Sequence, residues 1–137
     1  GPPVGARRPV IVIDASAVVG ALAREGDARD HLVREPVAVP HLVDAEVAHA
    51  LRRQVMRGAL PAPEAGRRLH RWSRLTVRRQ SAVALIPRIW QLREALSAFG
   101  ATYVALAESF GCPLVTCDEP LARAPGTRCR FHVVGRR

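Results

Sequence analysis

Short apolar segments without polar interruptions constrain the fold of this chain more than any other feature. Val10 to Ile13 and Leu114 to Thr116 carry aliphatic or β-branched side chains at every position, without the alternation that a half-exposed strand would show. Strands of this kind are buried on both faces, as happens in parallel sheets that helices cover on each side. The sequence therefore predicts an α/β fold with a short, mainly parallel central sheet.

Helical segments separate these apolar segments, as parallel strand connections require. Their ends are marked by residues such as Pro87, which suits a helix start, and Gly58 and Gly111, which suit helix ends. The predicted helices cover residues 16–24, 27–34, 42–57, 63–76, 87–98 and 101–110. The predicted strands cover residues 10–13, 37–39, 114–116 and 131–134, and residues 81–86 fit a strand only ambiguously.

The length of 137 residues is sufficient for one domain with a substantial core. We interpret residues 9–137 as that domain and residues 1–8 as a tail. Gly1 and Pro2 could remain from a protease site in a recombinant product. No apolar run approaches the roughly 18 residues that a membrane span needs, and no signal peptide is recognisable, so we expect no membrane association.

Charge and cysteine content indicate the surroundings in which the protein works. The net charge is +9, and all 21 basic residues are arginine. Guanidinium groups bind phosphates in a bidentate manner, which favours a nucleic-acid partner, although solubility and genome composition could also explain the arginine content. The three cysteines contain no C-x-x-C pair, so we expect buried thiols and a reducing, cytoplasmic location.

Two acidic residues lie just beyond the predicted inner strands. Asp14 directly follows the first strand, and Asp118 follows the strand in LVTC. The carboxyl ends of parallel strands meet at one edge of the sheet, where ligands bind in such folds. On a helical wheel a third acid, Glu46, borders the apolar stripe of the predicted helix 42–57. The spacing therefore predicts that Asp14, Glu46 and Asp118 gather at this edge.

Clustered carboxylates repel one another and stay ionised together when a divalent cation is present. In a strongly basic protein, such acids point to metal-assisted chemistry on a phosphodiester. The alternative for Asp14 and Asp118 is simple helix capping. Arg53 and Arg57, further along the helix of Glu46, could either pair with that acid or form a basic stripe leading to the site.

Three segments resemble PIN-domain ribonucleases, most closely toxins of the VapC type. They are IVIDASAVV, VPHLVDAEVAHALRR and ATYVALAESFGCPLVTCDEPLARA, and the likeness extends over nearly the whole chain from Arg8. The resemblance implies a three-layer α/β/α sandwich and a Mg²⁺-dependent site, with Mn²⁺ as a possible substitute. It also implies RNA cleavage that leaves a 5′-phosphate and a 3′-hydroxyl.

The resemblance assigns roles to individual residues of this sequence. Asp14 in IDAS, Glu46 in DAEV and Asp118 in VTCD match the family's catalytic, metal-holding acids. Ser16 and Thr116 match supporting hydroxyl positions, with a helix cap and an ordinary strand residue as the respective alternatives.

One position departs from the family pattern. Gly100 occupies the place of an aspartate, two residues before the stretch TYVALAE. Losing one of four carboxylates should weaken metal binding, so we predict reduced or abolished cleavage. The glycine could reflect inactivation of a toxic nuclease, or it could be natural in a non-catalytic PIN-fold module that binds RNA or protein.

The resemblance also implies partners. These are an RNA substrate, to which Arg53 and Arg57 are candidate contacts, a cognate antitoxin and a second copy of the chain. The predicted helices 42–57 and 63–76 are the expected antitoxin surface, and Trp90 and Leu92 could serve either dimer contact or core packing. A phospho-accepting receiver domain is excluded because the chain has no lysine, and a P-loop is excluded because its motif is absent.

Overall fold

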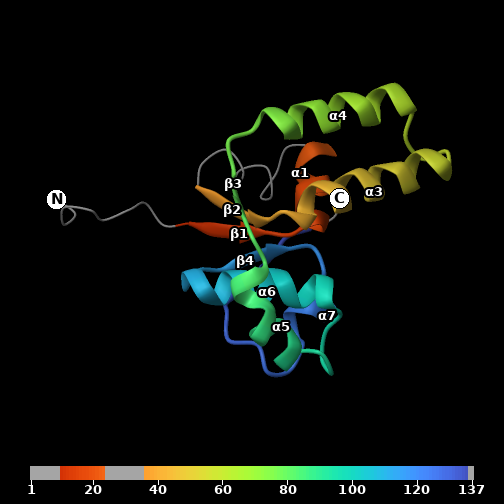
Figure 1. Ribbon diagram of the computed structural model, residues 1–137. Coiled ribbons are helices and arrows are strands. Elements are labelled where there is room, and N and C mark those ends of the chain that lie inside the picture. Colours follow the sequence, from red (N-terminus) through yellow and green to blue (C-terminus); the bar gives the residue numbers. More distant parts are fainter. Residues whose placement is uncertain (1–9, 24–35, 136–137) are drawn as a thin grey trace.

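A computed structural model describes residues 10–23 and 36–135. Within these residues a five-stranded sheet runs in the order β3-β2-β1-β4-β5, and every neighbouring pair is parallel (Figure 1). The strands are β1 (Ile11–Ile13), β2 (Val37–Pro40), β3 (Arg78–Gln80), β4 (Leu114–Thr116) and β5 (Phe131–Val133). The predicted parallel sheet is confirmed.

Helices cover both faces of the sheet, which gives the predicted three-layer α/β/α arrangement (Figure 1). One layer contains α1 (Ala15–Ala23), α3 (Leu42–Met56) and α4 (Ala62–Arg74). The opposite layer contains α6 (Ala98–Phe110) against the strands and α5 (Ile86–Gln91) packed on α6. The short elements are the 3₁₀ turn η1 (Val83–Leu85) and α7 (Glu119–Ala122), which follows β4.

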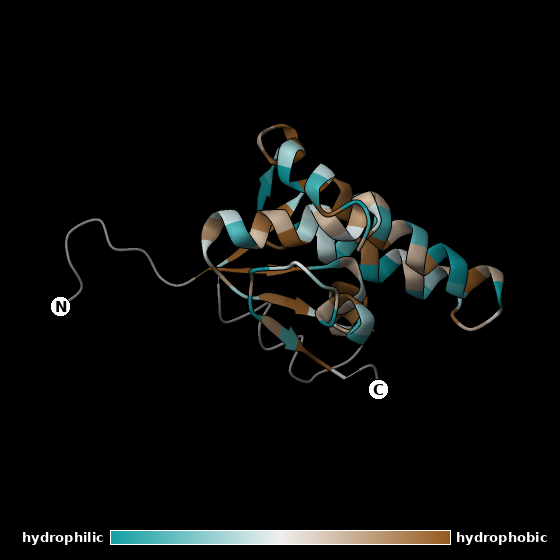
Figure 2. Ribbon diagram, turned by 90° about the horizontal axis from the view of Figure 1, so that it is seen from below, coloured by the Kyte–Doolittle hydropathy of each residue, from teal (hydrophilic) through white to brown (hydrophobic). Residues whose placement is uncertain are grey.

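The core lies between the inner strands and the helices that face them. Every residue of β1, β2 and β4 is buried, as their wholly apolar or β-branched sequences predict. In Figure 2 the inner strands carry hydrophobic colour, whereas the edge strand β3 is hydrophilic. Helix α6 buries every residue from Ala101 to Ala107, which is expected of a helix that is apolar all round. The acids that follow β1 and β4 are therefore held by a rigid interior.

Several predicted boundaries are confirmed by the residues that begin or end each helix. Pro87 lies in the first turn of α5, and Gly111 ends α6 with a left-handed φ of 63°. Gly58, which follows α3, has a φ of 75°. Positive φ values at helix ends favour glycine because it has no Cβ to collide with the preceding turn.

The assignment of residues 81–86 to a strand is wrong. The strand lies at Arg78–Gln80, and residues 83–85 form a 3₁₀ turn. The strand escaped detection because β3 is an edge strand with polar, partly exposed residues. The helix predicted over 87–98 ends earlier, at Gln91. The helix predicted to start at residue 101 begins at Ala98 instead, because Ser97 caps it.

Two other predictions lie outside the described residues, namely the tail at 1–8 and the helix at 27–34. Within residues 10–23 and 36–135, no helix is long and apolar enough to cross a membrane.

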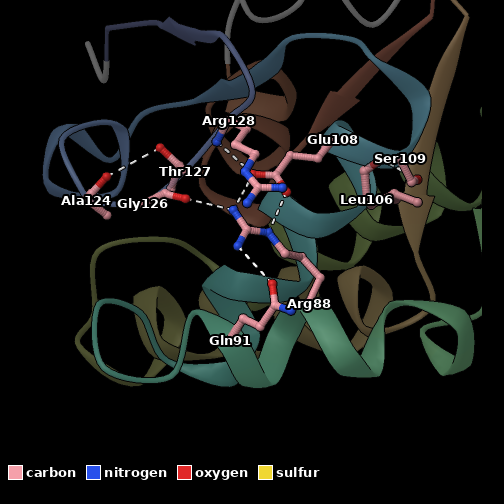
Figure 3. A network of polar contacts seen from close by, with 9 residues as sticks. All are labelled: Arg88, Gln91, Leu106, Glu108, Ser109, Ala124, Gly126, Thr127 and Arg128. Carbon is pink, nitrogen blue, oxygen red and sulfur yellow. Dashed lines mark hydrogen bonds and ion pairs between the residues drawn. The ribbon is translucent and has the colours of Figure 1, made fainter.

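A polar network joins helices α5 and α6 to the segment that follows α7 (Figure 3). Arg88 of α5 donates to both carboxylate oxygens of Glu108 on α6, at 2.7 and 3.0 Å, and to the carbonyl oxygen of Gly126 at 2.7 Å. The backbone N–H of Arg128 donates to Glu108 at 2.7 Å. Burial opposes ionisation of Glu108, but Arg88 and the Arg128 N–H outweigh it and lower the pKa of this carboxyl.

Replacing Glu108 with Gln should therefore destabilise the protein. We expect a loss of about 2 kcal/mol in the free energy of unfolding, measured with urea at neutral pH, because charge-assisted hydrogen bonds are lost in a partly buried place. Since the pKa of Glu108 is lowered in the folded state, its ionic contribution is fully present above the ordinary value of 4.5 and is lost as the pH falls below it.

The matched control is Glu119→Gln. The Glu119–Arg123 ion pair is 3.4 Å long and both side chains are about two-thirds exposed, at 68% and 70%, so little change is expected. Equal losses in the two variants would contradict this account of the network.

Candidate active site at the carboxyl edge of the sheet

Asp14 is buried at the point where β1 passes into α1, and only 6% of its surface is exposed. Its backbone N–H donates to the carbonyl oxygen of Val115, which extends the contact between β1 and β4. Its Oδ1 accepts from the Ser16 hydroxyl at 2.7 Å and from the Ala17 N–H at 3.0 Å, and its Oδ2 accepts from the Thr116 hydroxyl. Asp14 therefore caps α1 while its carboxylate is anchored across two strands.

Two hydroxyl groups join Asp14 to the end of β4. The Ser16 oxygen also accepts from the backbone N–H of Cys117 at 3.0 Å, and the Thr116 oxygen accepts from the backbone N–H of Asp118 at 2.9 Å. Each hydroxyl thus donates to the carboxylate and accepts from the strand end. Ser16 is not the helix cap, because Asp14 takes that place, and Thr116 does more than fill a strand position.

The other two acids approach from different elements. Asp118 follows β4, and its Oδ1 accepts from the Leu121 N–H at 3.1 Å, so it caps the short helix α7. Glu46 projects from α3, is partly buried, and accepts a 2.6 Å hydrogen bond from the Tyr103 hydroxyl of α6. Both aspartates therefore have the helix-capping contacts that sequence reasoning offered as an alternative to metal binding.

The three carboxylates nevertheless influence one another. Burial is the main reason why the pKa of Asp14 is raised; its hydroxyl and N–H donors oppose the rise, and the negative charge of Asp118 adds to it. Burial also raises the pKa of Glu46, which Tyr103 opposes and the charge of Asp14 reinforces. Asp14 therefore interacts electrostatically with each of the other two acids, at one edge of the sheet of a basic protein.

The chemistry of these donors fits Mg²⁺. Among residues 10–23 and 36–135, no three His, Cys, Asp or Glu side chains form a ready cage for a cation. Mg²⁺ does not require such a cage, because it usually keeps several waters and binds one or two carboxylates together with substrate phosphates. Burial is the main cause of the raised pKa of Asp14, and a divalent cation would relieve the smaller part that comes from repulsion by Asp118. That the three acids share one cation stays a prediction.

Gly100 lies in the first turn of α6, where its N–H donates to the Ser97 hydroxyl at 3.2 Å. A Cβ built on Gly100 would be 3.4 Å from the Leu121 Cδ1 of α7 and 3.7 Å from the Ser97 oxygen. Both are tolerable contacts, and no unusual backbone conformation requires glycine here. The position therefore accepts a Cβ beside the helix that Asp118 begins, and it lies one helical turn before Tyr103.

The basic candidates occupy the far end of α3. Arg53 and Arg57 are exposed, and no ion pair joins either of them to Glu46 in the described part of the chain. Several other arginines on α4 and β3 have partners within the protein. Arg67 and Arg68 pair with Glu64, Arg79 pairs with Asp44, and Arg71 donates to the Leu22 carbonyl oxygen. The basic stripe remains the consistent interpretation of Arg53 and Arg57.

Sequence reasoning missed Tyr103 as a member of this site. The available signal was a single tyrosine in an apolar helix, whose hydroxyl needs a hydrogen-bond partner when it is buried.

The two residues proposed for either dimer contact or core packing differ in exposure. Leu92 is 3% exposed and belongs to the core, whereas Trp90 is 65% exposed.

The fold and site together define a class of protein: an α/β domain whose two central strands end in carboxylates, with a third acid on a flanking helix. The PIN domain family model matches residues 11–126, which include all three acids. Ribonuclease VapC9 of Mycobacterium tuberculosis is 46% identical over 127 residues, which cover 93% of this chain and 100% of the relative.

Two solved structures share the fold. PAE2754 from Pyrobaculum aerophilum superposes with a TM-score of 0.68 and 27% identity, over 90% of this chain and 83% of that one. VapBC2 from Rickettsia felis, bound to a DNA fragment from their promoter, gives a TM-score of 0.66 at 12% identity, over 90% and 97% of the two chains. The chain belongs to the PIN-domain family and is a member of its VapC-type ribonucleases.

The hydroxyl bridge at Thr116 can be tested by a shape-conserving substitution. Thr116→Val removes a donor from a buried carboxylate, so we expect a loss of roughly 1–3 kcal/mol in the free energy of unfolding at neutral pH. Without this donor the pKa of Asp14 should rise further, so the loss should shrink as the pH falls and Asp14 becomes protonated. Urea unfolding at several pH values measures both effects.

Thr102→Val is the control, since Thr102 is also buried but its hydroxyl donates only to the Ala98 carbonyl oxygen within the same helix. A similar and pH-independent loss in both variants would refute the special role of Thr116.

Proposed function

We propose that this protein is a Mg²⁺-dependent endoribonuclease toxin of a toxin–antitoxin pair, impaired by the glycine at position 100. The observation that carries the proposal is the buried Asp14 carboxylate, which lies within the electrostatic influence of both Asp118 and Glu46 at one edge of the sheet. Ribonuclease activity agrees with the name of the relative that shares 46% of its aligned residues.

In this mechanism Asp14, Glu46 and Asp118 hold Mg²⁺ or Mn²⁺, and the hydroxyls of Ser16 and Thr116 fix the orientation of Asp14. The bound cation would supply a more acidic water as nucleophile and would offset negative charge on the phosphodiester. The three acids would bind the cation and orient it toward the phosphodiester. The hydroxyls of Ser16 and Thr116 keep the Asp14 carboxylate in one position.

The exposed Arg53 and Arg57 would contact RNA phosphates along α3, on the same helix as Glu46. Such contacts position the substrate without reading its sequence. A structured RNA with unstacked bases is the expected target, because proteins select RNA by shape and by exposed bases.

Gly100 limits the activity in this proposal. Three carboxylates would carry a charge of −3 where the family pattern carries −4, so cation affinity should be lower. The alternative is a non-catalytic PIN-fold module that binds RNA or protein. It draws on the finding that all three acids already have hydrogen-bond partners within the protein.

A cognate antitoxin and a second copy of the chain complete the proposal. The paired helices α3 and α4 offer the antitoxin an arginine-rich surface beside the acidic edge. Exposed apolar side chains at Val83, Ile86 and Trp90 on η1 and α5 offer a contact for a homodimer. A reducing cytoplasm would keep the cysteines as thiols and not as disulfides.

The decisive experiment is Gly100→Asp, assayed for RNA cleavage with millimolar Mg²⁺ and with EDTA. We expect cleavage to rise by roughly tenfold or more, which is about 1.4 kcal/mol or more of transition-state stabilisation. The rise should depend on Mg²⁺, because the added carboxylate acts through the cation. A Cβ at position 100 would make only ordinary van der Waals contacts.

Gly100→Asn provides the matched control, since it adds the same volume without a charge and should leave cleavage unchanged. If Gly100→Asp remains silent on cellular RNA, the binding module becomes the better description.

Cation binding should also appear in thermal unfolding. Because the pKa values of Asp14 and Glu46 are raised in the folded state, the stability that these groups contribute is present at low pH and is lost as the pH rises through those values. Mg²⁺ binds the ionised carboxylates, so it should raise the Tm by roughly 2–6 °C near pH 7.5. The rise should be much smaller at a pH below the ordinary pKa values of 3.8 and 4.5, where both acids are largely protonated.

NaCl at equal ionic strength controls for general screening, and Asp118→Asn should reduce the response. An identical rise in Tm at both pH values would count against a carboxylate site.

A further inference from the structure

We propose that Tyr103 is the positioning residue of Glu46, holding this acid where it can act together with Asp14. The inference rests on the proposed function and assigns a role to a side chain outside the predicted acid set. It depends on one hydrogen bond, its burial and the elements that it connects.

The hydrogen bond links the two helical layers of the protein. Tyr103 lies on α6 and Glu46 on α3, which cover opposite faces of the sheet (Figure 1). The Tyr103 hydroxyl donates to the Glu46 Oε1 at 2.6 Å, and the tyrosine is only 3% exposed. A contact between these layers at this point fixes the acid relative to the strand ends.

Tyr103 is itself held beside Asp14. The backbone N–H of Ala15, the residue that follows Asp14, lies near the phenol oxygen and acts to lower its pKa. Burial and the nearby Glu46 and Asp14 charges raise the pKa of Tyr103 far above its ordinary value, so its hydroxyl remains a donor throughout the physiological range. One phenol group therefore lies beside the start of α1 and donates to the carboxylate on α3.

This contact matters because two effects disfavour an ionised Glu46 beside Asp14. Its negative charge is repelled by Asp14, and partial burial disfavours its ionised form. The Tyr103 hydroxyl donates to Oε1 and opposes both effects on the pKa of Glu46, which favours the ionised form that a cation would bind. Tyr103 lies one turn beyond Gly100, so the helix that lacks the family's aspartate still contributes to the site through this contact.

The test is Tyr103→Phe, which keeps the ring and removes only the hydroxyl. Mn²⁺ binding is measured by calorimetry near pH 7.5, without RNA. We expect roughly 10–100-fold weaker binding, which is the usual effect of removing a hydrogen-bond partner from a metal ligand. Thermal unfolding verifies that the variant folds, and Ser109→Ala, which removes an exposed hydroxyl from the same helix, should bind like the parent.

A double-mutant cycle distinguishes positioning from general stabilisation. In a Glu46→Ala background the hydroxyl has no carboxylate to hold, so Tyr103→Phe should cause no further loss of Mn²⁺ affinity. A purely structural role would give the same fold-loss in both backgrounds and would overturn the inference. Glu46→Asp gives a second test, because it keeps the charge but draws the carboxylate away from the phenol, and it should also weaken binding.

The outcomes separate the inference from the proposed function. If the parent binds Mn²⁺ and Tyr103→Phe binds within twofold of it, the positioning role is wrong while the metal site stands. If neither the parent nor Gly100→Asp binds Mn²⁺ at millimolar concentration, the proposed function fails, and the inference fails with it. If only Gly100→Asp binds, the same cycle is measured in that background, and an equal fold-loss with and without Glu46 would overturn the inference.

Discussion

The contact between Asp14 and the end of β4 is the interaction on which the acidic edge depends. A carboxylate that is 6% exposed would be costly to ionise on its own, and the fold surrounds it with two hydroxyls and a backbone N–H. Those same hydroxyls accept from the backbone N–H groups of Cys117 and Asp118. The geometry of the buried acid and the geometry of the neighbouring strand end are therefore fixed by one set of bonds.

The remaining parts of the site converge on this point from separate elements. Asp118 begins α7, Glu46 lies on α3, and Tyr103 on α6 reaches across to it. The polar network around Arg88 and Glu108 secures the segment beyond α7 to the outer helices (Figure 3). An acidic edge assembled from both helical layers depends on their mutual position, so its geometry is a property of the whole fold and not of one loop.

Sequence reasoning predicted the parallel sheet, the helices on its two faces and the places of Asp14 and Asp118, because short apolar strands and helix ends leave local signals. It failed to find β3. An edge strand pairs with only one neighbouring strand and can carry polar side chains, so the two arginines of β3 resemble the sequence of a surface loop. It also could not pair Tyr103 with Glu46, since these residues are 57 positions apart and nothing local joins them. Contacts across layers require the tertiary structure.

The edge strands have a consequence for assembly. One lateral border of the sheet, β3, presents Arg78 and Arg79, and the other, β5, presents a partly exposed phenylalanine beside an exposed histidine. Charged side chains on an edge strand resist extension by a strand from another molecule, which applies to the β3 border. Association that prolongs the ladder beyond β3 is thereby disfavoured, so a protein that approaches this side is expected to dock against the neighbouring helices rather than continue the hydrogen-bonded ribbon.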